Sequence, residues 1–151
     1  MRLLPVWGLV LATGVAGCAA PGQLSTPSGR PEVTIREADP QRVADACVAY
    51  CAGRGWEVER ADRLIVQACA PAGFGTSLLI GSQYDAQAWN RISFTIAPRA
   101  RMTTVYGAQS VVGNRGSAFE RVTPLNSQSA FDGMQSILVE ALSSLDADTA
   151  P

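Results

Sequence analysis

The chain offers few side chains that could do chemistry near neutral pH. It has 151 residues, with four cysteines and no histidine. Without histidine there is no Ser-His-Asp or Cys-His nucleophile, and the imidazole ligands of the usual hydrolytic zinc sites are missing. The thiols and the carboxylates remain, and their spacing decides which reactions deserve consideration.

Glu57 and Glu59 are a pair of acids whose spacing could suit catalysis. Residues two apart on a strand point to the same side, and a glycosidase uses two carboxylates at one site. One of the two must also sit in surroundings that raise its pKa, and nothing nearby in the sequence indicates such a pocket. We interpret the pair as part of a solvated strand face and expect no enzymatic activity.

Cys18 stands at the end of an apolar run that begins at Leu3. The run is shorter than the roughly 20 residues of a membrane-spanning helix, and with Arg2 before it the stretch 1–17 has the form of a signal peptide. The residues Val15-Ala16-Gly17-Cys18 resemble the lipobox of bacterial lipoproteins. That resemblance implies cleavage before Cys18, diacylation of its thiol, and usually acylation of the new amine as well.

Two or three acyl chains would hold the protein stably on a bilayer, whereas one would not. An Asp directly after the lipidated cysteine would resemble an inner-membrane retention signal. Ala19 stands at that position here, which favours the periplasmic face of the outer membrane. The expected partners are the lipid bilayer and an unidentified envelope protein, and the covalent lipid is the only prosthetic group expected. Residues 18–30 are rich in Pro, Gly and Ser and predict a flexible tether.

Composition excludes nucleic acid as a partner. Cleavage before Cys18 would leave 11 arginines against 13 acidic residues, with no lysine, a net charge of −2. Such a chain lacks the clustered positive charge on which nucleic-acid binding depends. We expect residues 31–147 to form one domain, large enough to fold without metal or disulfide, and residues 148–151 to be a disordered tail.

Cys47, Cys51 and Cys69 lie within this domain. They are one ligand short of a structural zinc set, and the spacing Cys47-x3-Cys51 is not that of a zinc knuckle, so we expect no metal. An i,i+4 pair on an intact helix lies near the long limit of disulfide geometry. The remaining hypotheses are a bond from Cys51 or Cys47 to Cys69, favoured by an oxidising compartment, and three buried thiols.

The elements that must position these residues follow from local patterns. Asp39-Pro40 predicts the start of a helix that ends near Ala52, and a second helix is expected over residues 127–145. Strands are expected at residues 32–35, in a hairpin from Trp56 to Ala70, around Ile92 to Ile96, and at residues 101–112. Residues 76–82 are ambiguous between a helical turn and a strand. The order β-α-β-β-β-β-α predicts a two-layer α+β sandwich, with an antiparallel sheet and both helices on one face.

This organisation favours a non-enzymatic interaction module. Residues 117–122, leading to Asn126 and the last helix, resemble small uncharacterised bacterial lipoproteins, which implies a compartment and no activity. The expected interaction face is the outward row Arg91, Ser93 and Thr95, followed by the loop 71–75 and the segment 113–126. The alternative is a carrier of a small apolar ligand, with a cavity between helices and sheet; its lining would come from Trp56, Phe94, Phe131 and Met134.

Overall fold

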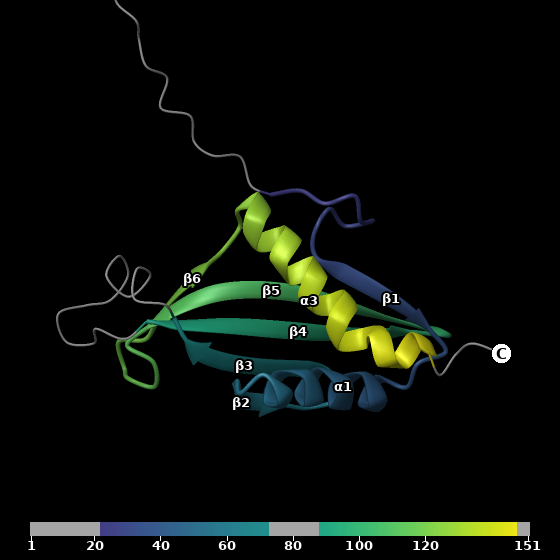
Figure 1. Ribbon diagram of the computed structural model, residues 1–151, viewed down its shortest axis with the longest axis horizontal. Helices are drawn as coiled ribbons and strands as arrows, with labels where there is room; N and C mark the ends of the chain where they lie inside the picture. The colour runs from purple at the N-terminus through teal and green to yellow at the C-terminus, as the bar shows by residue number, and fades with distance from the viewer. Residues whose placement is uncertain (1–21, 73–87, 148–151) are drawn as a thin grey trace, which may run out of the picture.

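The computed structural model describes residues 22–72 and 88–147, which form six strands and two helices (Figure 1). The predicted signal peptide, the tail and the ambiguous stretch 76–82 lie outside the described residues. In chain order the elements are β1 (Glu32–Arg36), α1 (Pro40–Gly53), β2 (Glu57–Ala61), β3 (Ile65–Pro71), β4 (Trp89–Arg99), β5 (Met102–Gly113), β6 (Arg121–Pro124) and α3 (Gln128–Ala147).

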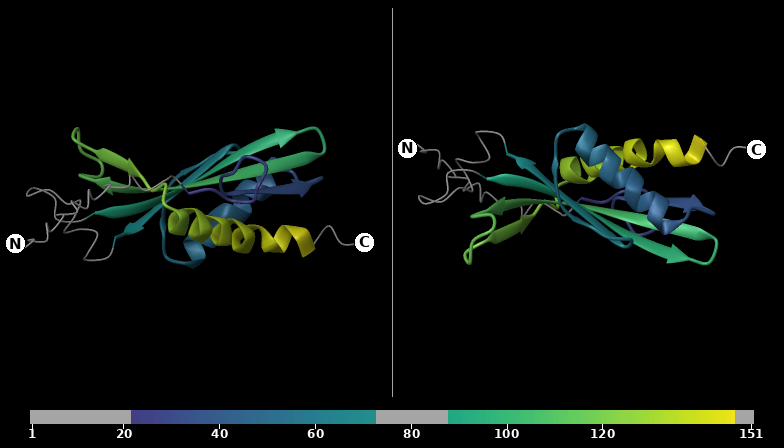
Figure 2. Two further views of the ribbon diagram at one scale, coloured as in Figure 1. Left: turned by 90° about the horizontal axis from the view of Figure 1, so that it is seen from above. Right: turned by 90° about the horizontal axis from the view of Figure 1, so that it is seen from below.

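The predicted two-layer α+β architecture is confirmed. Both helices lie on the same face of one antiparallel sheet, which Figure 2 shows from two sides. The predicted order lacks only β6. This strand has four residues, all exposed, and its sequence Arg-Val-Thr-Pro has no clear apolar alternation, so it is recognised only by its pairing with β5.

The strands lie in the order β1-β5-β4-β3-β2, and β6 also pairs with β5. Because β4 takes one edge of β5, β1 and β6 share the other edge, one after the other. The pairing with β1 ends at Tyr106 and the pairing with β6 begins at Ser110. The stretch of β5 between these two pairings therefore faces a gap between the two short edge strands.

Helix α1 forms for local reasons. The side chain of Asp39 accepts a hydrogen bond of 2.8 Å from the backbone N–H of Gln41, and Pro40 occupies the first turn, where no helical partner for its nitrogen is needed. The helix begins where the sequence predicts and ends at Gly53, one residue later than expected. Its buried residues face the sheet: Pro40, Val43, Ala44, Cys47 and Cys51.

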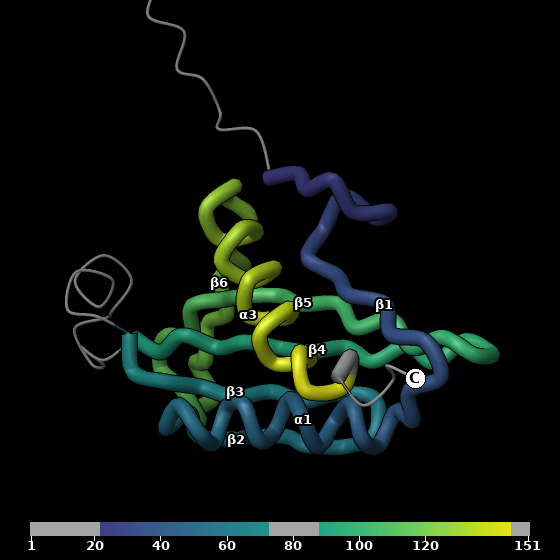
Figure 3. The backbone as a smooth tube through the Cα atoms, turned by 45° about the vertical axis from the view of Figure 1, so that its right-hand side comes forward, coloured from purple at the N-terminus to yellow at the C-terminus, as the bar shows by residue number. Residues whose placement is uncertain are grey.

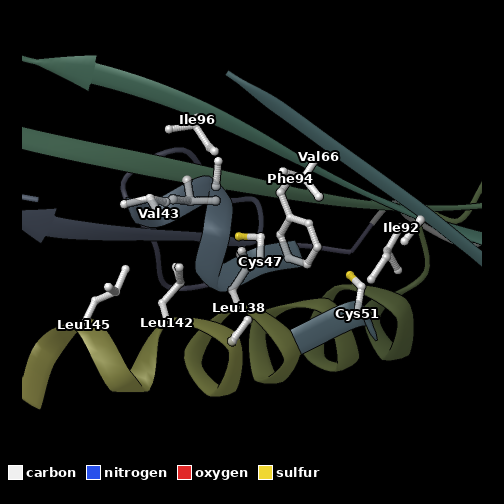
Figure 4. Close-up of a cluster of buried hydrophobic side chains, with 14 of the residues drawn as sticks. Val43, Cys47, Cys51, Val66, Ile92, Phe94, Ile96, Leu138, Leu142 and Leu145 are labelled. Atoms are coloured by element: carbon white, nitrogen blue, oxygen red, sulfur yellow. The ribbon is translucent and has the colours of Figure 1, made fainter. Parts of the chain in front are cut away.

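The core between helices and sheet consists of buried apolar side chains from both layers. Figure 4 shows Leu138 of α3 and Cys47 of α1 converging on Phe94 of β4. One apolar stripe of α3 is buried, at Met134, Leu138, Ala141, Leu142 and Leu145. The two helices thus cover the apolar side of the central strands.

Gly107 of β5 lets α3 approach the sheet closely. A Cβ atom at this position would lie 2.6 Å from the Cε and 2.7 Å from the Cγ of Met134, and 3.1 Å from Leu138 Cδ1. Any larger residue would therefore push the helix away from β5. Glycine here is required by packing against the helix rather than by a turn.

Candidate functional site

The face of the sheet that the helices leave open carries the residues predicted to form the interaction surface. Strict alternation along β4 sends Ile92, Phe94 and Ile96 into the core, so Arg91, Ser93 and Thr95 lie on the opposite face. The hydroxyl of Ser93 accepts a hydrogen bond of 3.1 Å from the side-chain amide of Gln67, and Thr95 is exposed. The two hydroxyl residues thus lie at or near the surface.

Arg91, the first residue of the expected outward row, does not present an open guanidinium. Its Nε donates to Glu59 at 2.8 Å and its Nη1 donates to Glu120 at 3.1 Å, and the side chain is only 15% exposed. Its hydrogen-bonding capacity is already largely used within the protein. Arg91 therefore has a structural role in the folded domain.

Arg115 extends this arrangement into a network. Its Nε donates to Glu59 at 2.6 Å and its Nη1 donates to Glu57 at 2.9 Å. The guanidinium also stacks 4.3 Å from the ring centroid of Trp89, a favourable cation-π distance. We call these three carboxylates and two guanidiniums, Glu57, Glu59, Arg91, Arg115 and Glu120, the ion-pair network.

The network fixes the loop between β5 and β6. Asn114 and Gly116 have positive φ values of 54° and 74°, which turn the chain back over the sheet. The Glu120 carboxylate accepts the backbone N–H of Gly116 at 3.0 Å, and the Ser117 hydroxyl donates to the Asn114 carbonyl at 2.8 Å. Residues 114–120, which we call the Phe119 loop, are therefore held by their own hydrogen bonds and by the sheet.

The electrostatics of the network favour fully ionised side chains. Hydrogen bonding and attraction to Arg115 lower the pKa of Glu57, and the backbone N–H of Gly116 lowers the pKa of Glu120. Burial alone would raise the pKa of Glu59, but the hydrogen bonds from Cys69, Arg91 and Arg115 outweigh it, so that pKa is also lowered. Neither Glu57 nor Glu59 has the raised pKa that a glycosidase acid requires.

These shifts predict weaker stability in acid. A carboxylate whose pKa is lower in the folded state contributes its full stabilisation above the unfolded value, here 4.5 for glutamate, and loses it as the pH falls through the folded value. We expect the free energy of unfolding, measured by denaturant titration, to be steady near neutrality and to fall below about pH 4.5.

Glu59→Gln should flatten this acid dependence. The comparison with the parent separates the contribution of the network to the acid dependence from that of Asp62. The pKa of Asp62 is lowered independently by the backbone N–H groups of Leu64 and Ile65. A parent and a Glu59→Gln variant with identical pH profiles would contradict the prediction.

Cys69 lies beneath the network, and its position corrects the disulfide hypothesis. It stands opposite Glu57 and Arg91 in the strand register, on the open face, whereas Cys47 and Cys51 lie in the core on the helix face. The sheet separates the two groups. All three thiols are free and buried, so the expected bond from Cys51 or Cys47 to Cys69 is absent and the alternative of three buried thiols describes the structure.

Burial makes these thiols unreactive. It raises the pKa of Cys47 to about 12 and those of Cys51 and Cys69 to about 11, with the Glu59 carboxylate adding to the effect at Cys69. Thiolate is the nucleophile and the metal ligand, so little of the reactive form exists near neutral pH. Among the described residues there is no cluster of three or more Cys, His, Asp or Glu arranged to hold a metal ion.

The Phe119 loop presents an exposed aromatic side chain beside the network. Phe119 is 81% exposed, the most exposed large apolar residue among those described, and Val122 of β6 is 47% exposed. A pocket of about 380 Å³ adjoins the loop, lined by Glu59, Trp89, Arg115, Gly116 and Glu120. The loop thus combines an exposed apolar tip with a charged pocket beside it.

A second, larger pocket lies at the gap between β1 and β6. It has a volume of about 770 Å³, and we call it the edge pocket. Of the four residues proposed for a carrier cavity, Phe131 and Met134 border it, whereas Phe94 is fully buried and Trp56 packs against the core. Its lining mixes apolar and polar side chains, including Tyr106, Leu125, Gln109 and Asn126.

Trp89, Arg115 and Glu120 are the site residues that sequence reasoning did not single out. Arg115 is in the turn Gly113-Asn114-Arg115-Gly116, and the segment 113–126 ranks only third among the expected surfaces. The only local signal for Arg115 is its place in a turn, between Asn114 and Gly116, which are both suited to positive φ. Its carboxylate partners lie more than 50 residues away on β2, so the sequence does not reveal them. The loop 71–75 is described only as far as Ala72.

No family model matches the chain, and no curated protein matches it either. In the part of the chain that the structure describes, neither helix has the length and apolar character needed to cross a bilayer.

Proposed function

We propose that this protein is a lipid-anchored module of the bacterial envelope that binds another protein through the Phe119 loop. The anchor is inferred from the sequence Val15-Ala16-Gly17-Cys18. The observation that carries the binding role is the exposure of Phe119 on a loop fixed by hydrogen bonds and ion pairs. A fixed loop loses little conformational entropy on binding, so most of the free energy gained by burying its aromatic tip contributes to affinity.

The direct test replaces Phe119 by Glu in the full-length protein. Because the side chain is already in water, the substitution should leave folding intact, while a charge at a desolvated interface should abolish co-purification of the envelope partner. The matched control is Val139→Glu on α3, which changes another exposed apolar residue, 56% exposed, on a different face. Crosslinked envelopes would be affinity-purified with each protein. Retention of the partner by Phe119→Glu at the parental level would refute this surface.

Cys18→Ser tests the anchor. The serine hydroxyl does not replace the acceptor thiol of the lipobox, so the variant should lose its lipid and move to the aqueous periplasmic fraction, or remain uncleaved. The measurement is fractionation of membranes with mass analysis of the N-terminal peptide. A Cys18→Ser protein that is still processed and held in the membrane would contradict the lipoprotein proposal.

A second function, the carriage of a small ligand, is favoured by the edge pocket alone. Its volume of about 770 Å³ falls within the usual range of small-molecule sites, and Phe131, Met134 and Leu125 supply apolar walls. Native mass spectrometry of protein purified from membranes should then show an adduct that Ala130→Trp, which fills the pocket, removes. Detection of the same adduct in both proteins would exclude the pocket as its site.

A further inference from the structure

The first described residues of the chain are fixed to the start of α3. The backbone N–H of Gly22 donates to the carbonyl of Asn126 at 2.7 Å, and that of Gln23 donates to Gln128 Oε1 at 2.9 Å. A Cβ at Gly22 would lie 2.9 Å from both Gln128 Cα and the Ser127 carbonyl oxygen. These are backbone atoms that cannot move aside independently, so this contact requires glycine.

The rest of the segment up to β1 is also held in place. The N–H of Leu24 donates to the carbonyl of Gly29 at 3.0 Å, the N–H of Gly29 donates to that of Thr26 at 3.0 Å, and Gly29 has a φ of 70°. The N–H of Ser28 donates to the side chain of Glu32 at 3.3 Å. Residues 22–30, which the sequence assigns to the tether, thus form a turn packed on the domain.

This contact shortens the reach of the anchor. Only residues 19–21 separate Cys18 from Gly22, and four fully extended residues span at most about 14 Å. If the whole segment up to Pro31 were free, thirteen residues would span about 45 Å. The difference decides whether the domain can turn freely above a membrane or is held in one orientation.

We infer that the segment 22–30 orients the domain on the bilayer, with the first turn of α3 towards the lipid headgroups. This inference rests on the proposed acylation of Cys18. Figure 3 shows the segment and the start of α3 together at one extremity of the molecule, with β2 and α1 at the opposite extremity. The bilayer-facing end would include the edge pocket, because Gly22, Gln23 and Arg30 form part of its wall.

The inference can be tested with two single labels on the acylated protein in lipid vesicles. Ser129→Cys places a nitroxide on the first turn of α3, and Arg63→Cys places one in the turn between β2 and β3; both positions are exposed. The three native domain thiols are buried with raised pKa values, so labelling is selective. With nickel chelated to a lipid headgroup, relaxation of the label at 129 should be strongly enhanced, and that at 63 little changed.

Gly22→Val supplies the matched control. The added side chain cannot fit against the backbone of Ser127 and Gln128, so it should release the segment and lengthen the free tether without touching the core. The difference between the two labels should then largely disappear, while the melting temperature of the domain stays close to that of the parent. Equal enhancement at both labels in the parent would overturn the inference, as would a preference that survives Gly22→Val.

Failure of the proposed function has a different signature. If mass analysis finds Cys18 unacylated and the protein does not sediment with vesicles, the anchor and this inference fall together. If Cys18 is acylated and the protein sediments but its labels respond equally, the anchor stands and the fixed orientation alone is refuted.

Discussion

Truncation of Leu138 to alanine is expected to lower the free energy of unfolding by about 2–5 kcal/mol. Leu138 is fully buried, and its Cδ1 lies in the close contact between α3 and Gly107 of β5. The surrounding strands are fixed by their ladders and cannot collapse into the space, so a cavity should remain. Since domains of this kind are stable by only about 5–15 kcal/mol, the loss is a large part of the total.

The matched control is Val139→Ala, one residue further along α3. Val139 is 56% exposed, so its truncation should change stability by less than about 0.5 kcal/mol. Denaturant unfolding of both variants under the same conditions measures the difference. Equal stabilities for Leu138→Ala and the parent would mean that α3 does not depend on its contact with the sheet.

The second large effect is expected from Glu59→Ala. Glu59 is the acceptor that Arg91 and Arg115 share, and its side chain is only 20% exposed. Its removal leaves two guanidiniums close together with one carboxylate partner each, so we expect a loss of about 1.5–3 kcal/mol, as for hydrogen bonds to charged groups. Glu140→Ala is the matched control, because the Glu140–Arg54 pair is exposed on both sides and should contribute no more than about 1 kcal/mol.

Cys69 provides a readout that a general loss of stability would not reproduce. Its thiol lies under the network, and the Glu59 carboxylate is one of the groups that raise its pKa. Glu59→Ala should therefore speed alkylation of Cys69 under native conditions, while Cys47 and Cys51 remain protected in the core. Uniform labelling of all three thiols would indicate global unfolding instead, and unchanged protection of Cys69 would show that the network does not cover it.

The two proposals assign different roles to two surfaces of the domain. The segment 22–30 and the start of α3 would face the bilayer, and the Phe119 loop would meet a protein partner. The Phe119 loop belongs to the open face of the sheet, and the α3 contact belongs to its edge. Phe119→Glu and Gly22→Val therefore test separate surfaces, and neither substitution alters the core.

Local patterns in the sequence determined the elements and the side of each that is buried. Asp39 and Pro40 start α1, and the spacing of Met134, Leu138 and Leu142 gives α3 one apolar face. Alternation along β4 separates Phe94 from Arg91. These features depend on residues within about four positions of one another, so periodicity and capping suffice to predict them.

Tertiary structure alone decided which distant residues meet. The register of β2 and β3 places Cys69 away from the helices, and the return of the chain after β5 brings Arg115 to Glu59 and Glu120 to Arg91. The same holds for Gly22, which meets α3 across more than 100 residues. A sequence pattern specifies which face a residue takes, but strand order and loop path specify its neighbours, and these depend on how the whole sheet packs.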